Sequence, residues 1–226
     1  QTESSMAGRG QTPIEVLRET GILERPTLIA HGAGITPADI EILAQYEQVG
    51  VAHSPKTYLR LASDITPIPG LRAAGIPVGL ATDGAASNST MNILEPLRLM
   101  AMLQKWIPTD AERMPIPEAL DIAFRGSAEV LGMGERLGRI EPGYLADLLL
   151  IDLNGSHHQP LHSRTASLVY NTQPADIRTV ICHGEVIYRD GVHQRLDKAR
   201  IIANVRERMD RLAQRIPEKR IQVYNP

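Results

Sequence analysis

Three short apolar runs constrain the fold of this chain more than any other feature, because each run stops at a polar residue suited to chemistry. The runs cover residues 27–30, 51–52 and 76–81. The polar residues that close them are His31, His53 and Asp83. Amphipathic segments separate the runs, and continuous apolar runs that alternate with helices are typical of buried parallel strands. The pattern predicts an α/β fold built from βα units.

Helix signals lie where such units require them. Residues 12–15 (Thr-Pro-Ile-Glu) and 36–39 (Thr-Pro-Ala-Asp) each place a threonine and a proline ahead of an acidic residue, which is the pattern of a capped helix start. Gly21 and Gly50 are expected to end these two helices, because glycine readily adopts the backbone conformation that closes a helix.

The three polar residues are expected to converge. All strands of a parallel sheet end at one edge, where barrel enzymes and doubly wound sheets place their chemistry. Histidine and aspartate are ligands of catalytic zinc and also act as the acid and base of hydrolases. The alternative is that His31, His53 and Asp83 are solitary polar residues, each satisfied in its own loop. Their matching positions favour the functional interpretation.

The second half of the chain has a different pattern. Helices are expected over residues 91–105 and 117–131, a strand over 146–153, and a hairpin between 177–182 and 185–188. A final helix is expected from residue 196, with an apolar stripe formed by Ile201, Val205, Met209, Leu212 and Ile216. We expect this helix to dock on its own domain, with a dimer helix as the alternative.

Composition excludes several classes of protein. The 226 residues carry a net charge of −2, which gives no general attraction for nucleic acid or an anionic membrane. Cys182 is the only cysteine, so an internal disulfide and a cysteine zinc cluster are excluded. No apolar run reaches the roughly 20 residues of a membrane helix. These features predict a soluble, cytoplasmic protein that binds neither membrane nor nucleic acid.

Four segments occur in an order that resembles the amidohydrolase superfamily. They are residues 28–31 (Leu-Ile-Ala-His), 51–55 (Val-Ala-His-Ser-Pro), 80–88 (Leu-Ala-Thr-Asp-Gly-Ala-Ala-Ser-Asn) and 138–148 (Gly-Arg-Ile-Glu-Pro-Gly-Tyr-Leu-Ala-Asp-Leu). Within the superfamily they look most like the branch of the chlorohydrolases, or triazine hydrolases, and the S-adenosylhomocysteine/methylthioadenosine deaminases.

The resemblance implies a fold. It would be the C-terminal part of a (β/α)₈ TIM-type barrel, with strands of a small flanking β-sandwich and a C-terminal helix. The expected division is residues 1–135 for the barrel part, 136–195 for the sandwich portion and 196–226 for the helix. Barrel strands one to five, with a His-x-His pair and a further histidine ligand, would precede Gln1. A missing N-terminal segment is therefore expected as a partner, and a homo-oligomer is expected as well.

The resemblance also implies roles. Asp83 matches the family's metal-ligating aspartate, Glu3 matches its proton-shuttling glutamate and His31 matches its catalytic histidine. His53, Ser87 and Asn88 would contact the substrate. The implied cofactor is one divalent metal ion, zinc with iron(II) as the alternative. The implied reaction is hydrolytic deamination or dechlorination of a small nitrogen heterocycle by metal-activated water.

Several alternatives remain open. His53 has a structural interpretation, in which it bonds to loop backbone, and Ser87 and Asn88 could instead cap the following helix. Residues 54–58 depart from the family pattern, so the identity of the substrate is not carried over. His157, His158 and His162 are too irregularly spaced to predict a metal site and are expected on the surface. The competing function is a truncated or inactive amidohydrolase-like binding or assembly module.

Overall fold

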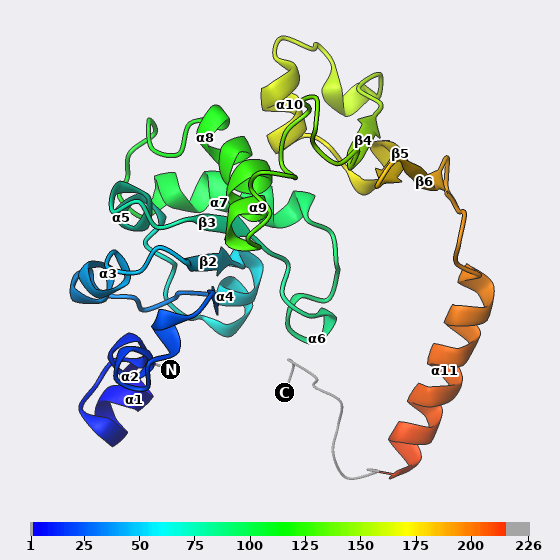
Figure 1. The fold of residues 1–226 in the computed structure, drawn as a ribbon. Helices are drawn as coiled ribbons and strands as arrows, with labels where there is room; N and C mark the ends of the chain where they lie inside the picture. The colour runs from blue at the N-terminus through cyan, green and yellow to red at the C-terminus, as the bar shows by residue number, and fades with distance from the viewer. Residues whose placement is uncertain (1, 216–226) are drawn as a thin grey trace. The chain divides into compact units, whose positions relative to one another are not determined.

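The computed structural model describes residues 2–215, which form two compact units (Figure 1). The first unit comprises residues 2–146 and 152–176, and the second comprises 147–151 and 177–215. Residues 152–176, expected within the sandwich portion, thus group with the first unit. Within residues 2–215 no helix combines the length and the apolar character needed to cross a membrane.

A three-stranded parallel sheet forms the centre of the first unit, as the apolar runs predict. Its strands are β1 (Thr27–Ala30), β2 (Val49–His53) and β3 (Val78–Leu80), in the order β1-β2-β3. Val51 lies opposite Ile29 on one side and Val78 on the other. Most residues of the middle strand β2 and all residues of the outer strand β3 are buried, whereas the other outer strand, β1, alternates between half-buried and exposed residues.

Both predicted helix starts are capping boxes. The Thr12 hydroxyl accepts a hydrogen bond from the Glu15 N–H at the start of α2 (Pro13–Glu19), and the Glu15 carboxylate accepts one from the Thr12 N–H. Thr36 and Asp39 repeat this arrangement at the start of α3 (Pro37–Leu43). Asp39 is buried and also accepts a hydrogen bond from the Thr12 hydroxyl, so the two helix starts are joined. These caps explain why a local pattern sufficed to locate α2 and α3.

The first unit contains further helices. They are α1 (Thr2–Arg9), α2 (Pro13–Glu19), η1 (Ile22–Glu24), α3 (Pro37–Leu43), α4 (Pro55–Leu61), α5 (Ile68–Ala73), α6 (Ala85–Asn88), α7 (Leu94–Trp106), α8 (Ile116–Asp121), the π-helix η2 (Ile122–Gly126), α9 (Ser127–Val130), η3 (Ser156–His158), α10 (Arg164–Tyr170) and η4 (Pro174–Asp176). The expected helix at 91–105 corresponds to α7, and that at 117–131 is divided into α8, η2 and α9.

Glycines allow α9 and η2 to approach the sheet closely (Figure 1). A Cβ atom on Gly79 of β3 would lie 2.6 Å from the Val130 side chain, and one on Gly50 would lie 2.8 Å from it. Gly50 was predicted to end a helix. That prediction is wrong, because Gly50 lies inside β2, where the packing of Val130 leaves no room for a side chain.

The second unit contains an antiparallel sheet. Its strands are β4 (Leu148–Ile151), β5 (Ile177–Cys182), β6 (Glu185–Arg189) and β7 (Val192–His193), in the order β4-β5-β6-β7. His183 and Gly184 connect β5 to β6 with φ angles of 50° and 80°. Two successive positive φ angles are typical of the tight hairpin turn that the sequence predicts here.

The C-terminal helix α11 (Lys198–Arg215) forms where it was expected. None of its residues is buried, and Val205 on its apolar stripe is 53% exposed. Docking of this helix on its own domain stays a prediction. Ile216, the last residue of the predicted stripe, lies outside the described residues.

Candidate active site

His31 and Asp83 come together just beyond the carboxyl ends of β1 and β3. The Nε2 atom of His31 lies 3.9 Å from Oδ2 of Asp83. Both residues have left-handed backbone conformations, with φ angles of 73° and 62°. Such conformations cost a non-glycine residue roughly 1–3 kcal/mol and persist where surrounding contacts enforce them, often at functional sites. This pair is the centre of the candidate site.

Asp83 is held by hydroxyl and backbone donors. Ser87 Oγ donates to Oδ2 at 2.6 Å, and Thr57 Oγ1 donates to the same atom at 2.9 Å. The Gly84 N–H donates to Oδ1. These donors favour the ionised carboxylate, and the Ser87 hydrogen bond contributes most to holding the pKa of Asp83 below its ordinary value. Asp83 is therefore an anion throughout the neutral range.

Hydroxyl groups of buried side chains hold the backbone carbonyl of His31 in place. The Tyr58 hydroxyl donates to the His31 carbonyl at 2.7 Å, and Thr66 Oγ1 donates to it at 2.6 Å. The Tyr58 hydroxyl in turn accepts a hydrogen bond from the Ser54 N–H at 2.8 Å. Tyr58 is only 1% exposed. These contacts explain how His31 keeps its unfavourable backbone conformation.

His53 supports this network from inside the core. Its Nδ1 atom lies 2.9 Å from Thr66 Oγ1, and because the Thr66 proton points to the His31 carbonyl, Nδ1 carries the hydrogen. Nε2 has no hydrogen-bond partner within residues 2–215. The structure supports the alternative of a structural histidine, although its partner is a side chain rather than loop backbone. Contact between His53 and a substrate stays a prediction.

Burial lowers the pKa of His53 from 6.5 to about 3. Between those pH values the unfolded chain binds a proton here and the folded chain does not, so this group lowers the free energy of unfolding as the pH falls. The slope is up to about 1.4 kcal/mol per pH unit. We expect His53→Asn, which preserves a polar group for Thr66 but cannot titrate, to lose this slope in urea unfolding between pH 6 and about pH 4.

The exposed His193→Asn variant is the matched control and should keep the slope of the parent protein. Parallel pH profiles for the His53 variant and the parent would show that His53 does not carry this dependence.

A cavity of about 500 Å³ opens beside His31, and its lining includes Glu3, Tyr58 and Asp64. Glu3 lies on α1, a helix that the sequence analysis did not predict. The hydroxyl of Thr2, its neighbour, donates to the Gly34 carbonyl at 3.2 Å and so joins α1 to the loop that follows β1. The structure thus brings Glu3 and His31 to one cavity. Asp83 contacts His31 but is not part of the cavity lining.

Ser87 and Asn88 belong to α6 and do not cap the next helix, because α7 begins after Ile93 without a side-chain cap. Ser87 instead binds Asp83 directly. Asn88 is fully buried, and its side-chain amide donates to the Thr90 carbonyl. Both positions adjoin Asp83 in the chain, and their contact with a substrate stays a prediction.

The metal that the family resemblance implies requires more ligands than this pair supplies. Catalytic zinc is held by three protein ligands, whereas Asp83 is the only carboxylate beside His31 in the hydrogen-bonded group described above. No set of three potential ligands that includes Asp83 meets within residues 2–215. The residues around Asp83 therefore fit a single metal ligand, not a complete metal site.

Sequence reasoning missed the supporting side chains Thr57, Tyr58 and Thr66. Residues 57 and 58 were recognised only as a departure from the family pattern. Residues 57 and 58 are adjacent on α4, and adjacent residues of a helix point in different directions. Their adjacency therefore indicates that the two side chains support different parts of the site. Thr57 reaches Asp83, while Tyr58 reaches the carbonyl of His31.

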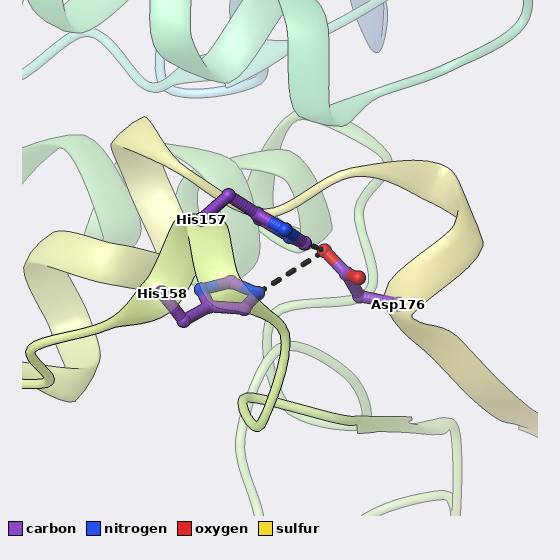
Figure 2. A group of neighbouring side chains, drawn as sticks. All are labelled: His157, His158 and Asp176. Carbon is purple, nitrogen blue, oxygen red and sulfur yellow. Dashed lines mark hydrogen bonds and ion pairs between the residues drawn. The ribbon is translucent and has the colours of Figure 1, made fainter.

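A second group of polar side chains lies in the segment that runs from η3 to η4 and includes none of the predicted site residues. His157 and His158 both approach Asp176 (Figure 2). The prediction that His157 and His158 are surface residues is wrong for His158, which is 1% exposed because it packs beneath α10 with Ser167 as a hydrogen-bond partner. His162 is exposed, as expected, and is not part of the group.

Comparisons with known proteins give the family. Residues 2–187 match the amidohydrolase family, and the chain belongs to that family. It is 43% identical over 189 residues to a 5-methylthioadenosine/S-adenosylhomocysteine deaminase of Desulforudis audaxviator, covering 84% of this chain and 44% of that protein. A protein of the same name from Pelotomaculum thermopropionicum is 40% identical over 215 residues, which are 95% of this chain and 49% of the relative.

Solved structures agree with this assignment. An adenosine deaminase from Xanthomonas campestris, solved with bound zinc, superposes with a TM-score of 0.88 at 31% identity, covering 94% of this chain and 48% of that one. A zinc complex of atrazine chlorohydrolase from Arthrobacter aurescens gives a TM-score of 0.81 at 30% identity, covering 91% and 46%. The chain therefore spans about half the length of the relatives that it matches.

Proposed function

We propose that this chain forms part of a metal-dependent hydrolase that cleaves a carbon–nitrogen bond, other than a peptide bond, on a nitrogen heterocycle. The observation that carries the proposal is the pairing of His31 with Asp83 at 3.9 Å, each in a left-handed backbone conformation beyond a parallel strand. Glu3 lines the cavity on which His31 lies. Strained polar residues at the carboxyl end of a parallel sheet are typical of an active site.

In this proposal the parallel sheet is the C-terminal part of a (β/α)₈ barrel. Family membership and the similarity to zinc-containing hydrolases support it. The proposed division keeps residues 1–135 as barrel, 136–195 as the sandwich portion and 196–226 as the C-terminal helix. The edge strand β1 pairs only with β2 among the described strands, so its other edge is available for a neighbouring barrel strand.

The described side chains suit distinct steps of a deamination. The ionised Asp83 accepts a hydrogen bond or proton from the attacking water, and His31 donates a hydrogen bond to the oxygen of that water as it adds to the ring carbon. As water adds to the carbon, Glu3 gives its proton to the ring nitrogen and is protonated again by the proton that the water releases. Glu3 then passes that proton to the amino group, which leaves as ammonia. The added hydroxyl group returns its proton to Glu3 as the carbon–oxygen double bond of the product forms. In the dechlorination alternative chloride leaves instead.

We further propose that Asp83 is the ligand of the catalytic metal that residues 2–215 supply, with zinc as the metal and iron(II) as the alternative. The remaining ligands would come from the part of the family's length that this chain does not span. The zinc in the related structures supports this choice. The methylthioadenosine and S-adenosylhomocysteine deaminase relatives favour a purine nucleoside as substrate.

The roles of His31 and Glu3 can be tested in the whole protein that carries this chain. Ammonia release from methylthioadenosine, S-adenosylhomocysteine and adenosine would be measured by steady-state kinetics. We expect His31→Asn and Glu3→Gln each to reduce kcat by about a hundredfold or more, the effect of losing an acid–base group, with bound zinc retained. Glu41→Gln, which changes an exposed carboxylate of α3 outside the cavity lining, is the control and should preserve kcat.

Loss of zinc from the His31 variant would show that His31 is a ligand and that its proposed role is wrong. If the parent protein binds these nucleosides without releasing ammonia or consuming them, the alternative of a non-catalytic binding module would replace the proposal. The shortfall of further metal ligands beside Asp83 within residues 2–215 is the observation that favours this alternative.

A further inference from the structure

Two histidines share one oxygen of a carboxylate in a part of the chain to which the proposed chemistry assigns no role. Nε2 of His157 lies 2.9 Å from Oδ2 of Asp176, and Nε2 of His158 lies 3.1 Å from the same oxygen. The three potential ligand atoms lie within 4.8 Å of one another. Figure 2 shows both imidazole rings directed at the Asp176 carboxylate.

The group is held by its surroundings. The side chain of His158 is 0% exposed and that of Asp176 is 12% exposed, whereas that of His157 is 40% exposed. Nδ1 of His158 lies 2.6 Å from Ser167 Oγ on α10, and the N–H of Gln173 donates to Oδ2 of Asp176 at 2.7 Å. Two of the three side chains are thus oriented by partners outside the group, while the third leaves a side open to solvent.

The side chains of the group also have the chemistry of metal ligands. A carboxylate that faces two imidazoles is the donor set of the two-histidine, one-carboxylate sites that hold divalent transition metals.

We propose that His157, His158 and Asp176 form a second divalent-metal site, suited to Zn²⁺ and separate from Asp83. Atoms bound to one tetrahedral zinc at about 2.0–2.1 Å lie roughly 3.3 Å apart, close to the separations between the imidazole nitrogens and the Asp176 oxygen. Small rotations of the exposed His157 ring would admit the ion. Water would complete the coordination on the open side.

Ser167 makes both the metal-free and the metal-bound state possible. A hydroxyl group donates or accepts, so it accommodates either neutral tautomer of His158. Without metal, Ser167 donates to Nδ1 and the Nε2–H donates to Asp176. With metal, Nδ1–H donates to Ser167 and bare Nε2 binds the ion, which is the usual arrangement of a metal-ligating histidine.

The ion would join η3 to η4 across the α10 segment. His157 and His158 lie on η3, and Asp176 ends η4, 18 residues after His158. Binding of an ion to the folded chain alone stabilises that state. The site would therefore stabilise this segment and would not depend on whether the proposed hydrolase activity exists.

The test is a titration of the metal-free full chain with Co²⁺ and then with Zn²⁺. Tetrahedral Co²⁺ bound by nitrogen and oxygen absorbs visible light, and zinc should displace it. We expect one equivalent of Co²⁺ to develop this absorption, and Zn²⁺ binding measured by calorimetry to weaken by about a hundredfold or more in His157→Ala and Asp176→Asn. Zinc should also raise the thermal midpoint of the parent protein but not of these variants.

Two controls separate this site from others. His193→Ala removes an exposed histidine of the second unit and should bind Zn²⁺ as the parent does. Asp83→Asn should keep the cobalt absorption, which distinguishes this site from the proposed catalytic metal. His157 is largely exposed, so its variant is expected to fold, as circular dichroism would verify. Absence of stoichiometric zinc binding, or equal affinity in the parent and in both cluster variants, would overturn the proposal.

Discussion

Asp83→Asn should reduce kcat for ammonia release by at least about a thousandfold in the whole protein that carries this chain. The substitution removes the charge but keeps a side chain of the same shape, so Thr57 and Ser87 retain a hydrogen-bonding partner. What is lost is the anion that binds the proposed metal and accepts a proton from water. Steady-state kinetics against methylthioadenosine and S-adenosylhomocysteine would measure the loss.

The control is Asp110→Asn, which changes an exposed carboxylate on the loop before α8 and should leave kcat within about twofold of the parent. Zinc content should fall with Asp83→Asn. That comparison belongs in a His157→Ala background, so that the second proposed metal site contributes nothing. Unchanged activity together with unchanged zinc in Asp83→Asn would remove Asp83 from both proposed roles.

A pH titration gives a finer test of the same carboxylate. Ser87 contributes most to lowering the pKa of Asp83, so Ser87→Ala should raise that pKa. This shift belongs to the metal-free protein, where an NMR titration of the Asp83 carboxyl would measure it. An unchanged pKa in Ser87→Ala would contradict the role given to the Ser87 hydroxyl.

Gly126→Ala should lower the free energy of unfolding by about 3 kcal/mol or more. Gly126 has right-handed helical backbone angles, so helix propensity alone predicts that alanine would stabilise the chain by up to about 1 kcal/mol. A Cβ atom at this position would, however, lie 2.2 Å from the carbonyl oxygen of Val78 in β3. Neither backbone can yield without disturbing a buried strand, so the clash decides the sign.

Gly8→Ala is the matched control, because Gly8 also lies in a helix and an added Cβ would meet no atom within 4 Å. This variant should be as stable as the parent or slightly more stable. Urea unfolding of both variants would measure the difference. A Gly126 variant no less stable than the parent would mean that η2 can move away from β3 at little cost.

Local patterns explain which parts of the fold could be predicted. The capping boxes at Thr12 and Thr36 depend on residues three positions apart, and the hairpin turn at His183 and Gly184 depends on two adjacent residues. The parallel sheet was also predictable, because a buried strand needs a continuous apolar run. The family match agrees with the resemblance seen in residues 80–88 and 138–148.

Features that depend on distant residues could not be predicted. Gly126 of the π-helix η2 packs closely against the backbone of Val78, and these two residues are far apart in the sequence. Asp176 lies 18 residues beyond His158, so the spacing of the histidines alone gave no reason to connect them. The extreme burial of His53 likewise depends on its position in the middle strand and on packing that no local pattern reports.

The left-handed backbone at His31 and Asp83 places stability and activity in opposition. Glycine adopts positive φ without the steric penalty that a side chain brings, so replacing either residue with glycine relieves roughly 1 kcal/mol or more of strain. The same change removes the imidazole or the carboxylate on which the proposed chemistry depends. Substitutions chosen for thermal stability alone would therefore remove this centre, so a stabilised form that keeps the proposed chemistry must gain its stability at other positions.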